Sequence, residues 1–170
     1  MGSSRYSFRN SNGIVNQGDE MKKETKKHIA EVEKNINRVI DELKVRANNH
    51  DKSKLESPEA EGFEQVTHKL RELTYGSDAY KEQLKKMMPF LDHHYEKNRH
   101  HPEHFRTGII DMTLIDLIEM LMDWLAATKR HSNGDIMKSI EINQKRFGYS
   151  NELKRIFINT IEEIKNEKNT

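Results

Sequence analysis

The chain has 170 residues, a net charge of +1 and no cysteine. These values exclude disulfides, thiolate metal sites and cysteine nucleophiles, and the near-neutral charge gives no sign of a nucleic-acid partner. The length suits one domain with a real core, and charged and hydrophobic residues at 34% each are typical of a helical, soluble protein with a polar surface.

Residues 1–18 are rich in serine, asparagine, glycine and arginine, which predicts a flexible N-terminal arm before a single helical domain over residues 19–170. The first predicted helix covers residues 19–47. Its apolar residues recur at steps of three and four: Ile29, Val32, Ile36, Val39, Ile40 and Leu43. Two asparagines at 48–49 end this helix and can cap a short one that begins at His50.

Further helices follow breaks at Ser57-Pro58, Gly76-Ser77 and Asn133-Gly134. The predicted ranges are 58–73, 78–97, 113–131, 135–147 and 150–167, with a loop over 98–112. No segment has the alternation of a strand, so the sequence predicts an all-α bundle of six or seven helices.

No apolar run reaches the roughly 18 residues of a membrane span, and no signal-peptide pattern opens the chain. We therefore expect a cytoplasmic protein without a membrane partner. The sequence leaves its oligomeric state open, a homodimer included.

Five of the nine histidines fall between residues 93 and 104. Histidine is the commonest metal ligand, so this run indicates a metal site. The apolar spacing of the 78–97 helix turns His94 inward and His93 elsewhere, to solvent or to a supporting role. In the loop that follows, we rank His101 before His104 as a ligand, and His100 stays open beside them.

The helix at 113–131 is apolar nearly all round, yet acids stand on it at steps of three and four: Asp116, Glu119 and Asp123. Buried carboxylates must be paired or must bind a cation. Asp116 can instead form a capping box with Thr113, and either Glu119 or Asp123 can pair with Arg130. Asp123 lies too deep in the helix to be a cap, which favours a ligand role.

The order of these residues resembles the HD-domain superfamily of metal-dependent phosphohydrolases. That pattern is a histidine on an early helix, a His-Asp pair, inserted histidines in two-metal members, and an aspartate on a later helix. The chain is also similar to an uncharacterised bacterial and phage family with the stretches His-Asp-Lys-Ser-Lys, His-His-Pro-Glu-His and Asp-Leu-Ile-Glu-Met-Leu-Met-Asp-Trp.

The resemblance implies one or two divalent ions, drawn from iron, manganese, cobalt, zinc and magnesium. The ligands it implies in this chain are His28, His50, Asp51, His94, His101 and Asp123. Such an ion lowers the pKa of bound water towards about 7 and so supplies hydroxide.

We therefore expect hydrolysis of a phosphate ester, either a nucleotide or another small phosphorylated substrate. Besides Asp51, the expected catalytic residues are Lys54, which matches a phosphate-contacting lysine of the superfamily, and His104 as the proton donor to the leaving oxygen. Lys54 also stands where some nucleotidases of the superfamily have a catalytic glutamate, which weakens the specific case for a nucleoside monophosphatase. Two alternatives stay open: a di-iron oxygenase of the same helical fold, and a metal-stabilised module that binds a nucleotide without turnover.

Overall fold

The computed structural model describes residues 12–73, 77–130 and 134–166. Within these ranges every regular element is helical, which confirms the predicted all-α class. The elements are α1 (Asn12–Asn49), η1 (Lys52–Leu55), α2 (Glu59–Arg71), α3 (Asp78–Lys97), η2 (Pro102–His104), η3 (Gly108–Asp111), α4 (Leu114–Thr128), α5 (Ile136–Phe147) and α6 (Asn151–Asn166).

The chain divides into two units, residues 1–42 and 43–170, where the sequence predicted one domain from residue 19. The first unit holds most of α1, which begins at Asn12 and so includes part of the predicted arm; residues 1–11 lie outside the described ranges. The apolar side chains that recur at helical spacing, such as Ile29 and Ile36, are exposed in this unit. These residues thus lie on a helix, as predicted, but their side chains are not buried.

The core of the second unit lies where α4 meets α5 and α6. Its buried side chains are Met120 and Leu121 of α4, Ile136 and Ile140 of α5, and Tyr149, Phe157 and Ile161 at α6. Because α4 places its apolar residues against this core, its acidic residues are left to face the opposite side.

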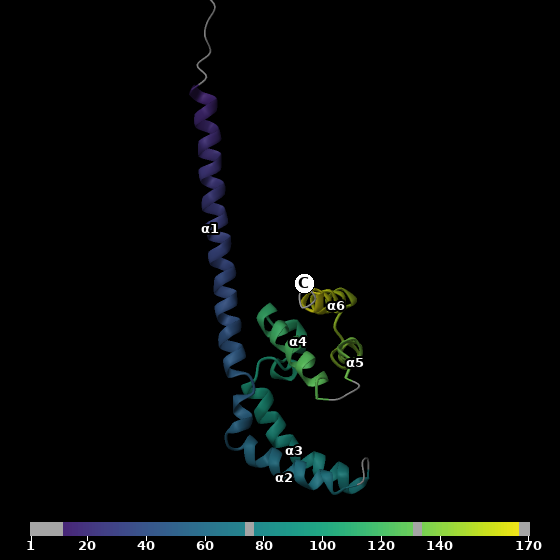
Figure 1. Cartoon of the computed structure of the whole chain (residues 1–170). Helices are drawn as coiled ribbons and strands as arrows, with labels where there is room; N and C mark the ends of the chain where they lie inside the picture. The colour runs from purple at the N-terminus through teal and green to yellow at the C-terminus, as the bar shows by residue number, and fades with distance from the viewer. Residues whose placement is uncertain (1–11, 74–76, 131–133, 167–170) are drawn as a thin grey trace, which may run out of the picture. The chain divides into compact units, whose positions relative to one another are not determined.

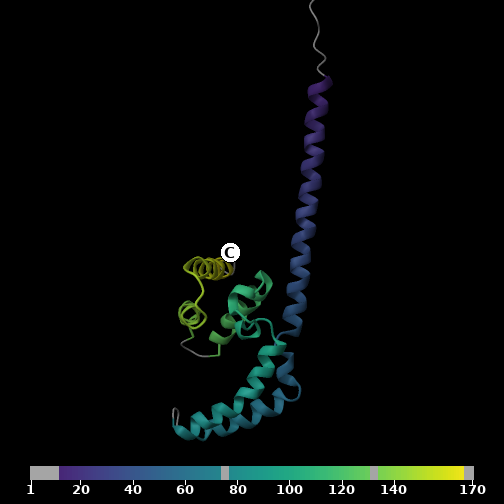
Figure 2. The same cartoon turned by 180° about the vertical axis from the view of Figure 1, so that it is seen from behind.

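The helices α2 and α3 lie side by side in both views of the chain (Figures 1 and 2). Gly62 permits this approach: a Cβ atom at that position would collide with the ring of Phe90. The pair therefore fixes Glu59, one turn before Gly62, relative to the last turns of α3.

Local signals set the ends of α4 and α5. The Thr113 hydroxyl oxygen accepts a hydrogen bond from the backbone N–H of Asp116, and the Asp116 carboxylate accepts one from the backbone N–H of Thr113, which completes the predicted capping box. Asp135 caps α5, and Gly148 ends it at φ 67°, a conformation that favours glycine. Within the described residues, none of the helices combines the length and apolar character that a bilayer span requires.

Candidate metal centre

The centre starts at the turn between α1 and η1. Asp51 has φ 56° and ψ 13°, in the left-handed region that asparagine and aspartate tolerate best after glycine. Its Oδ2 atom accepts a 2.7 Å hydrogen bond from Lys54 Nζ. The backbone turn and the lysine together hold the carboxylate with its other oxygen, Oδ1, facing inward.

Three histidines from α3 and the loop after it surround that oxygen. His94 and His100 are almost completely buried, at 1% exposure each, and His101 is half-buried. One ligand atom from each of these histidines and one from Asp51 all lie within 4.8 Å of one another. Atoms this close could hold a single cation, whose bonds to nitrogen and oxygen ligands are about 2 Å long.

The inward atoms of Asp51 and His100 have poor partners, whereas His94 and His101 can share one hydrogen bond. Asp51 Oδ1 lies 3.3 Å from His94 Nε2 and 3.5 Å from His100 Nε2, and the Nε2 atoms of His94 and His101 are 2.9 Å apart. Asp51 Oδ1 and both ring nitrogens of His100 are buried without a hydrogen bond. An unpaired buried polar atom costs about 1–3 kcal/mol, and a cation at the centre of the group would satisfy the inward ones.

The outer nitrogen of His94 is held by a buried carboxylate. Glu59 is fully buried, and its Oε2 lies 2.8 Å from His94 Nδ1, while its Oε1 lies 2.8 Å from His93 Nδ1. Ser53 donates a further hydrogen bond to Glu59. Because a carboxylate only accepts, it fixes the proton of His94 on Nδ1 and turns the Nε2 lone pair inward, as second carboxylates do in metal sites.

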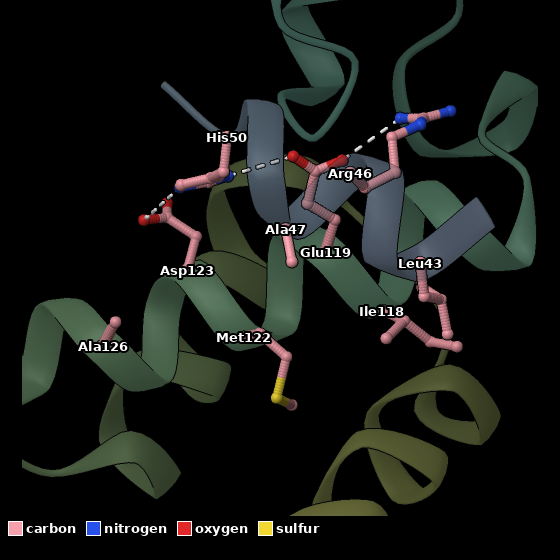
Figure 3. Close-up of a pocket in the computed structure, with 9 residues that line it drawn as sticks. All are labelled: Leu43, Arg46, Ala47, His50, Ile118, Glu119, Met122, Asp123 and Ala126. Atoms are coloured by element: carbon pink, nitrogen blue, oxygen red, sulfur yellow. Dashed lines mark hydrogen bonds and ion pairs between the residues drawn. The ribbon is translucent and has the colours of Figure 1, made fainter. Parts of the chain in front are cut away.

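A second group consists of His50, His100 and Asp123. His50 Nε2 lies 3.6 Å from Asp123 Oδ1. Glu119 holds the outer nitrogens of this group. Its Oε1 lies 3.0 Å from His50 Nδ1, and its Oε2 pairs with Arg46 (Figure 3). The same Oε1 lies 3.2 Å from His100 Nδ1. His100 belongs to both groups, so the two share one side chain.

Electrostatics divide the histidines into two kinds. Hydrogen bonds with Asp123 and Glu119 raise the pKa of His50 to about 10, against the effect of burial. Burial, with the neighbouring His100 and His94, lowers the pKa of His101 to about 3, and burial lowers that of His94. His94 and His101 are therefore neutral at pH 7, as ligands must be, whereas His50 holds a proton that a metal would have to displace.

The chemistry of this donor set fits a divalent metal. All the inward atoms are imidazole nitrogens and carboxylate oxygens, a combination that suits iron, manganese, cobalt and zinc. Three observations are consistent with a metal here. Inward atoms of Asp51 and His100 have no hydrogen bond, carboxylates hold the outer nitrogens of His94 and His50, and the rings of His94 and His101 are neutral.

Comparison with known proteins places the chain in a family. The model of one protein family matches residues 17–168, nearly the whole chain. The chain belongs to the DUF5662 family. This is described as a family of unknown function, so membership brings no activity with it. No curated protein and no solved structure matches the chain.

In this DUF5662 chain, the structure brings together five of the six ligands that the sequence predicted. They are His50, Asp51, His94, His101 and Asp123. The sixth, His28, is exposed on α1 within residues 1–42 and belongs to neither group, so its ligand role stays a prediction. Lys54 contacts Asp51 directly, and its side chain is 39% exposed.

His104 lies outside both groups. Its Nδ1 donates a 2.8 Å hydrogen bond to the Tyr95 carbonyl, and its role as a proton donor stays a prediction. Asp116 is not a ligand in either group: besides its capping role it accepts two hydrogen bonds from Arg99 and pairs with Arg46. The pairing of Glu119 is thus with Arg46, where the sequence suggested Arg130.

Sequence reasoning left three residues of the centre unassigned. His100 was left open, although its burial and its place in both groups make it central. For Glu119 the sequence suggests only a possible pair with Arg130, and no role beside His50 and His100. Glu59 was missed, because nothing local distinguishes a buried glutamate in a first helical turn from an exposed one.

Proposed function

We propose that this chain is a metal-dependent hydrolase of a phosphate ester, either a nucleotide or another small phosphorylated substrate. The observation that carries the proposal is the grouping of three histidine side chains with a buried Asp51 oxygen that has no hydrogen bond of its own. Perturbed, desolvated titratable groups of this kind cluster at functional sites.

A divalent ion held by Asp51, His94, His100 and His101 would supply Lewis acidity and lower the pKa of a water molecule towards about 7. Asp51 serves the centre with Oδ1, while its Oδ2 keeps Lys54 beside it. The exposed part of Lys54 can then offset the negative charge of a phosphoryl group that approaches from the rim.

The overall reaction is a simple hydrolysis. The water oxygen forms a bond to phosphorus, the bond between phosphorus and the ester oxygen breaks, and one water proton ends on the released alcohol. His104 stays the predicted donor of that proton to the leaving oxygen.

Replacement of Asp51 by asparagine tests the proposal most directly. Asparagine keeps the shape and tolerates the left-handed backbone, but it removes the charge that an ion needs. Elemental analysis of the purified variant should show metal content close to zero, and hydrolysis of p-nitrophenyl phosphate and nucleoside monophosphates should disappear. Asp92→Asn, at an exposed position of α3, should retain both. Full metal content with full activity in Asp51→Asn would contradict the assignment.

A second candidate, a di-iron oxygenase, is favoured by the two groups that share His100 and by their purely nitrogen and oxygen donors. Iron as the bound metal, together with substrate-dependent oxygen consumption, would select it over a hydrolase. A metal-loaded protein that binds nucleotides and neither hydrolyses them nor consumes oxygen would select the non-catalytic module.

A further inference from the structure

An apolar pocket of about 370 Å³ opens beside the second group, between the C-terminal end of α1 and α4 (Figure 3). Its volume is in the range of small-molecule sites. Apolar side chains from both helices line it: Leu43, Ala47, Ile118, Met122 and Ala126. All of its lining residues belong to the second unit.

The pocket has two chemically distinct rows because of helical spacing. On α4, Ile118, Met122 and Ala126 follow one another at steps of four, and Glu119 and Asp123 form the adjacent row one residue further on. The end of α1 repeats the arrangement, with Leu43 and Ala47 beside the Arg46–His50 row. One edge of the pocket is therefore apolar, and the other runs along the candidate metal centre.

The charges on the polar row are already paired. Arg46 lies 3.0 Å from an Asp116 oxygen and 3.1 Å from a Glu119 oxygen, and His50 contacts Glu119 and Asp123. Arg46 is thus committed to carboxylates and is poorly placed to hold a phosphate in the pocket. The interior of the pocket therefore offers apolar contacts, and the groups that could bind a polar part of a ligand lie along one edge.

The lining also argues against a nucleobase. Among the described residues that line the pocket, none is phenylalanine, tyrosine or tryptophan, and the apolar edge presents no polar side chain. Proteins that bind single bases stack them on aromatic or guanidinium planes and read their edges by hydrogen bonds. The two such planes in this pocket, those of Arg46 and His50, are already paired with carboxylates. Aliphatic and thioether side chains instead suit a flexible hydrocarbon chain.

We propose that this pocket binds the aliphatic part of the substrate, so that the chain acts on phosphate esters of aliphatic alcohols rather than on nucleotides. The inference rests on the proposed hydrolase for the reaction at the phosphate. In this arrangement the hydrocarbon lies along Ile118, Met122 and Ala126 while the phosphate lies at the centre beside Asp123. Water adds to phosphorus, the phosphorus–oxygen bond to the alkyl group breaks, and the alcohol leaves with its proton.

Binding of non-hydrolysable phosphonates tests the pocket without requiring turnover. Titration calorimetry on the metal-loaded protein should show n-octyl phosphonate binding at least about tenfold more tightly than methyl phosphonate, since each buried methylene adds affinity. Ala126→Leu and Ala47→Leu fill the pocket from opposite walls, and each should remove most of this preference. Ala79→Leu, at an exposed position of α3, should leave it unchanged. Equal affinity for the two phosphonates, or a preference that survives both filling variants, would overturn the inference.

Hydrolysis assays separate this inference from the proposed function. If the chain-length preference is present but no phosphate ester is hydrolysed with any metal, the hydrolase fails and the pocket assignment stands. If nucleotides are hydrolysed and alkyl phosphates show no chain-length dependence, the hydrolase stands and the inference fails. Co-sedimentation of the protein with phosphatidylcholine vesicles that carry phosphatidic acid would identify the substrate as a lipid. Binding of octyl phosphonate without co-sedimentation would identify it as a free alkyl phosphate. Both outcomes support an aliphatic substrate.

Discussion

The carboxylate of Glu59 is completely buried and accepts hydrogen bonds from two adjacent histidines of α3. Its pKa is lowered below the usual range, because the hydrogen bonds from His93, Ser53 and His94 outweigh the opposing effect of burial. The ionised Glu59 therefore fixes the ring of His94 rather than acting as a ligand itself.

Glu59→Gln should weaken metal binding about tenfold to a hundredfold, because the amide no longer holds the His94 ring and its tautomer as firmly. Competition titration against a chelator of known affinity would measure the change. Glu64→Gln, an exposed position on the same helix, is the matched control and should bind metal as the wild type does. Unchanged affinity in Glu59→Gln would mean that the His94 ring is held by other contacts.

The opposite pKa shifts of His50 and His101 predict a stability maximum for the metal-free protein near pH 6.5. The raised pKa of His50, about 10, adds stability that is complete below pH 6.5 and is lost as the pH rises towards 10. The lowered pKa of His101, about 3, adds stability that is complete above pH 6.5 and is lost as the pH falls towards 3.

Urea unfolding at pH 4.5, 6.5 and 9 would measure this dependence. His50→Gln should flatten the alkaline side of the profile, whereas His68→Gln, an exposed position of α2, should not. An alkaline side that is equally steep in His50→Gln would show that another group is responsible.

The sequence predicts some residues of the metal centre better than others. Helical spacing turns His94 inward and His93 away, and the structure agrees: His94 is buried, while His93 is partly exposed and contacts Glu59. No periodicity applies to the irregular segment after α3, so the sequence leaves His100 open and gives no reason to rank it above His101. A buried partner such as Glu59 depends on how α2 packs on α3, which no local pattern encodes.

At the scale of elements, the sequence predicts best those helix ends that carry a capping residue or a helix-breaking residue. The range of α3 matches the prediction of 78–97, and Thr113 stands immediately before α4 as its cap. The start of α1 was placed seven residues too late, because asparagine and glycine weaken the helical pattern without forbidding it. The short η2 and η3 were predicted as loop, since 3₁₀ turns have no strong sequence pattern.

The close approach of α2 and α3 depends on Gly62. Gly62→Ala should destabilise the protein by about 1–3 kcal/mol, because its Cβ atom would overlap the ring of Phe90. The same change should weaken metal binding, since Glu59 lies one turn earlier on the same helix. Urea unfolding and metal titration would measure the two effects.

Gly18→Ala is the control for Gly62→Ala, because a Cβ atom at residue 18 of α1 meets nothing within 4 Å. Alanine there should leave stability unchanged or raise it by about 0.5–1 kcal/mol. A Gly62→Ala variant as stable as Gly18→Ala would show that the two helices can separate slightly at no cost.

At the scale of the whole molecule, the centre connects segments that are distant in sequence. Its side chains come from the turn after α1, from α3, from the loop that follows α3 and from α4. A cation bound by all of them would stabilise only the folded state.

Saturating metal should therefore raise the free energy of unfolding, by about 4 kcal/mol at a concentration a thousand times the Kd. Thermal unfolding with manganese, iron, cobalt or zinc, and again after a chelator, would show this as a shift in Tm. The Asp51→Asn protein should show no such shift. A Tm that is indifferent to every metal and to the chelator would remove the basis of the proposed function.

Glu119 Oε1 faces the outer nitrogens of both His50 and His100, and His100 belongs to both metal groups. A neutral imidazole has one lone pair, so His100 would ligate an ion in only one of the two groups unless the ring also lost its remaining proton. The first ion would therefore lower the affinity of the protein for the second. Loading would proceed in two separate steps, and half-filled molecules would persist over a wide range of free metal concentration.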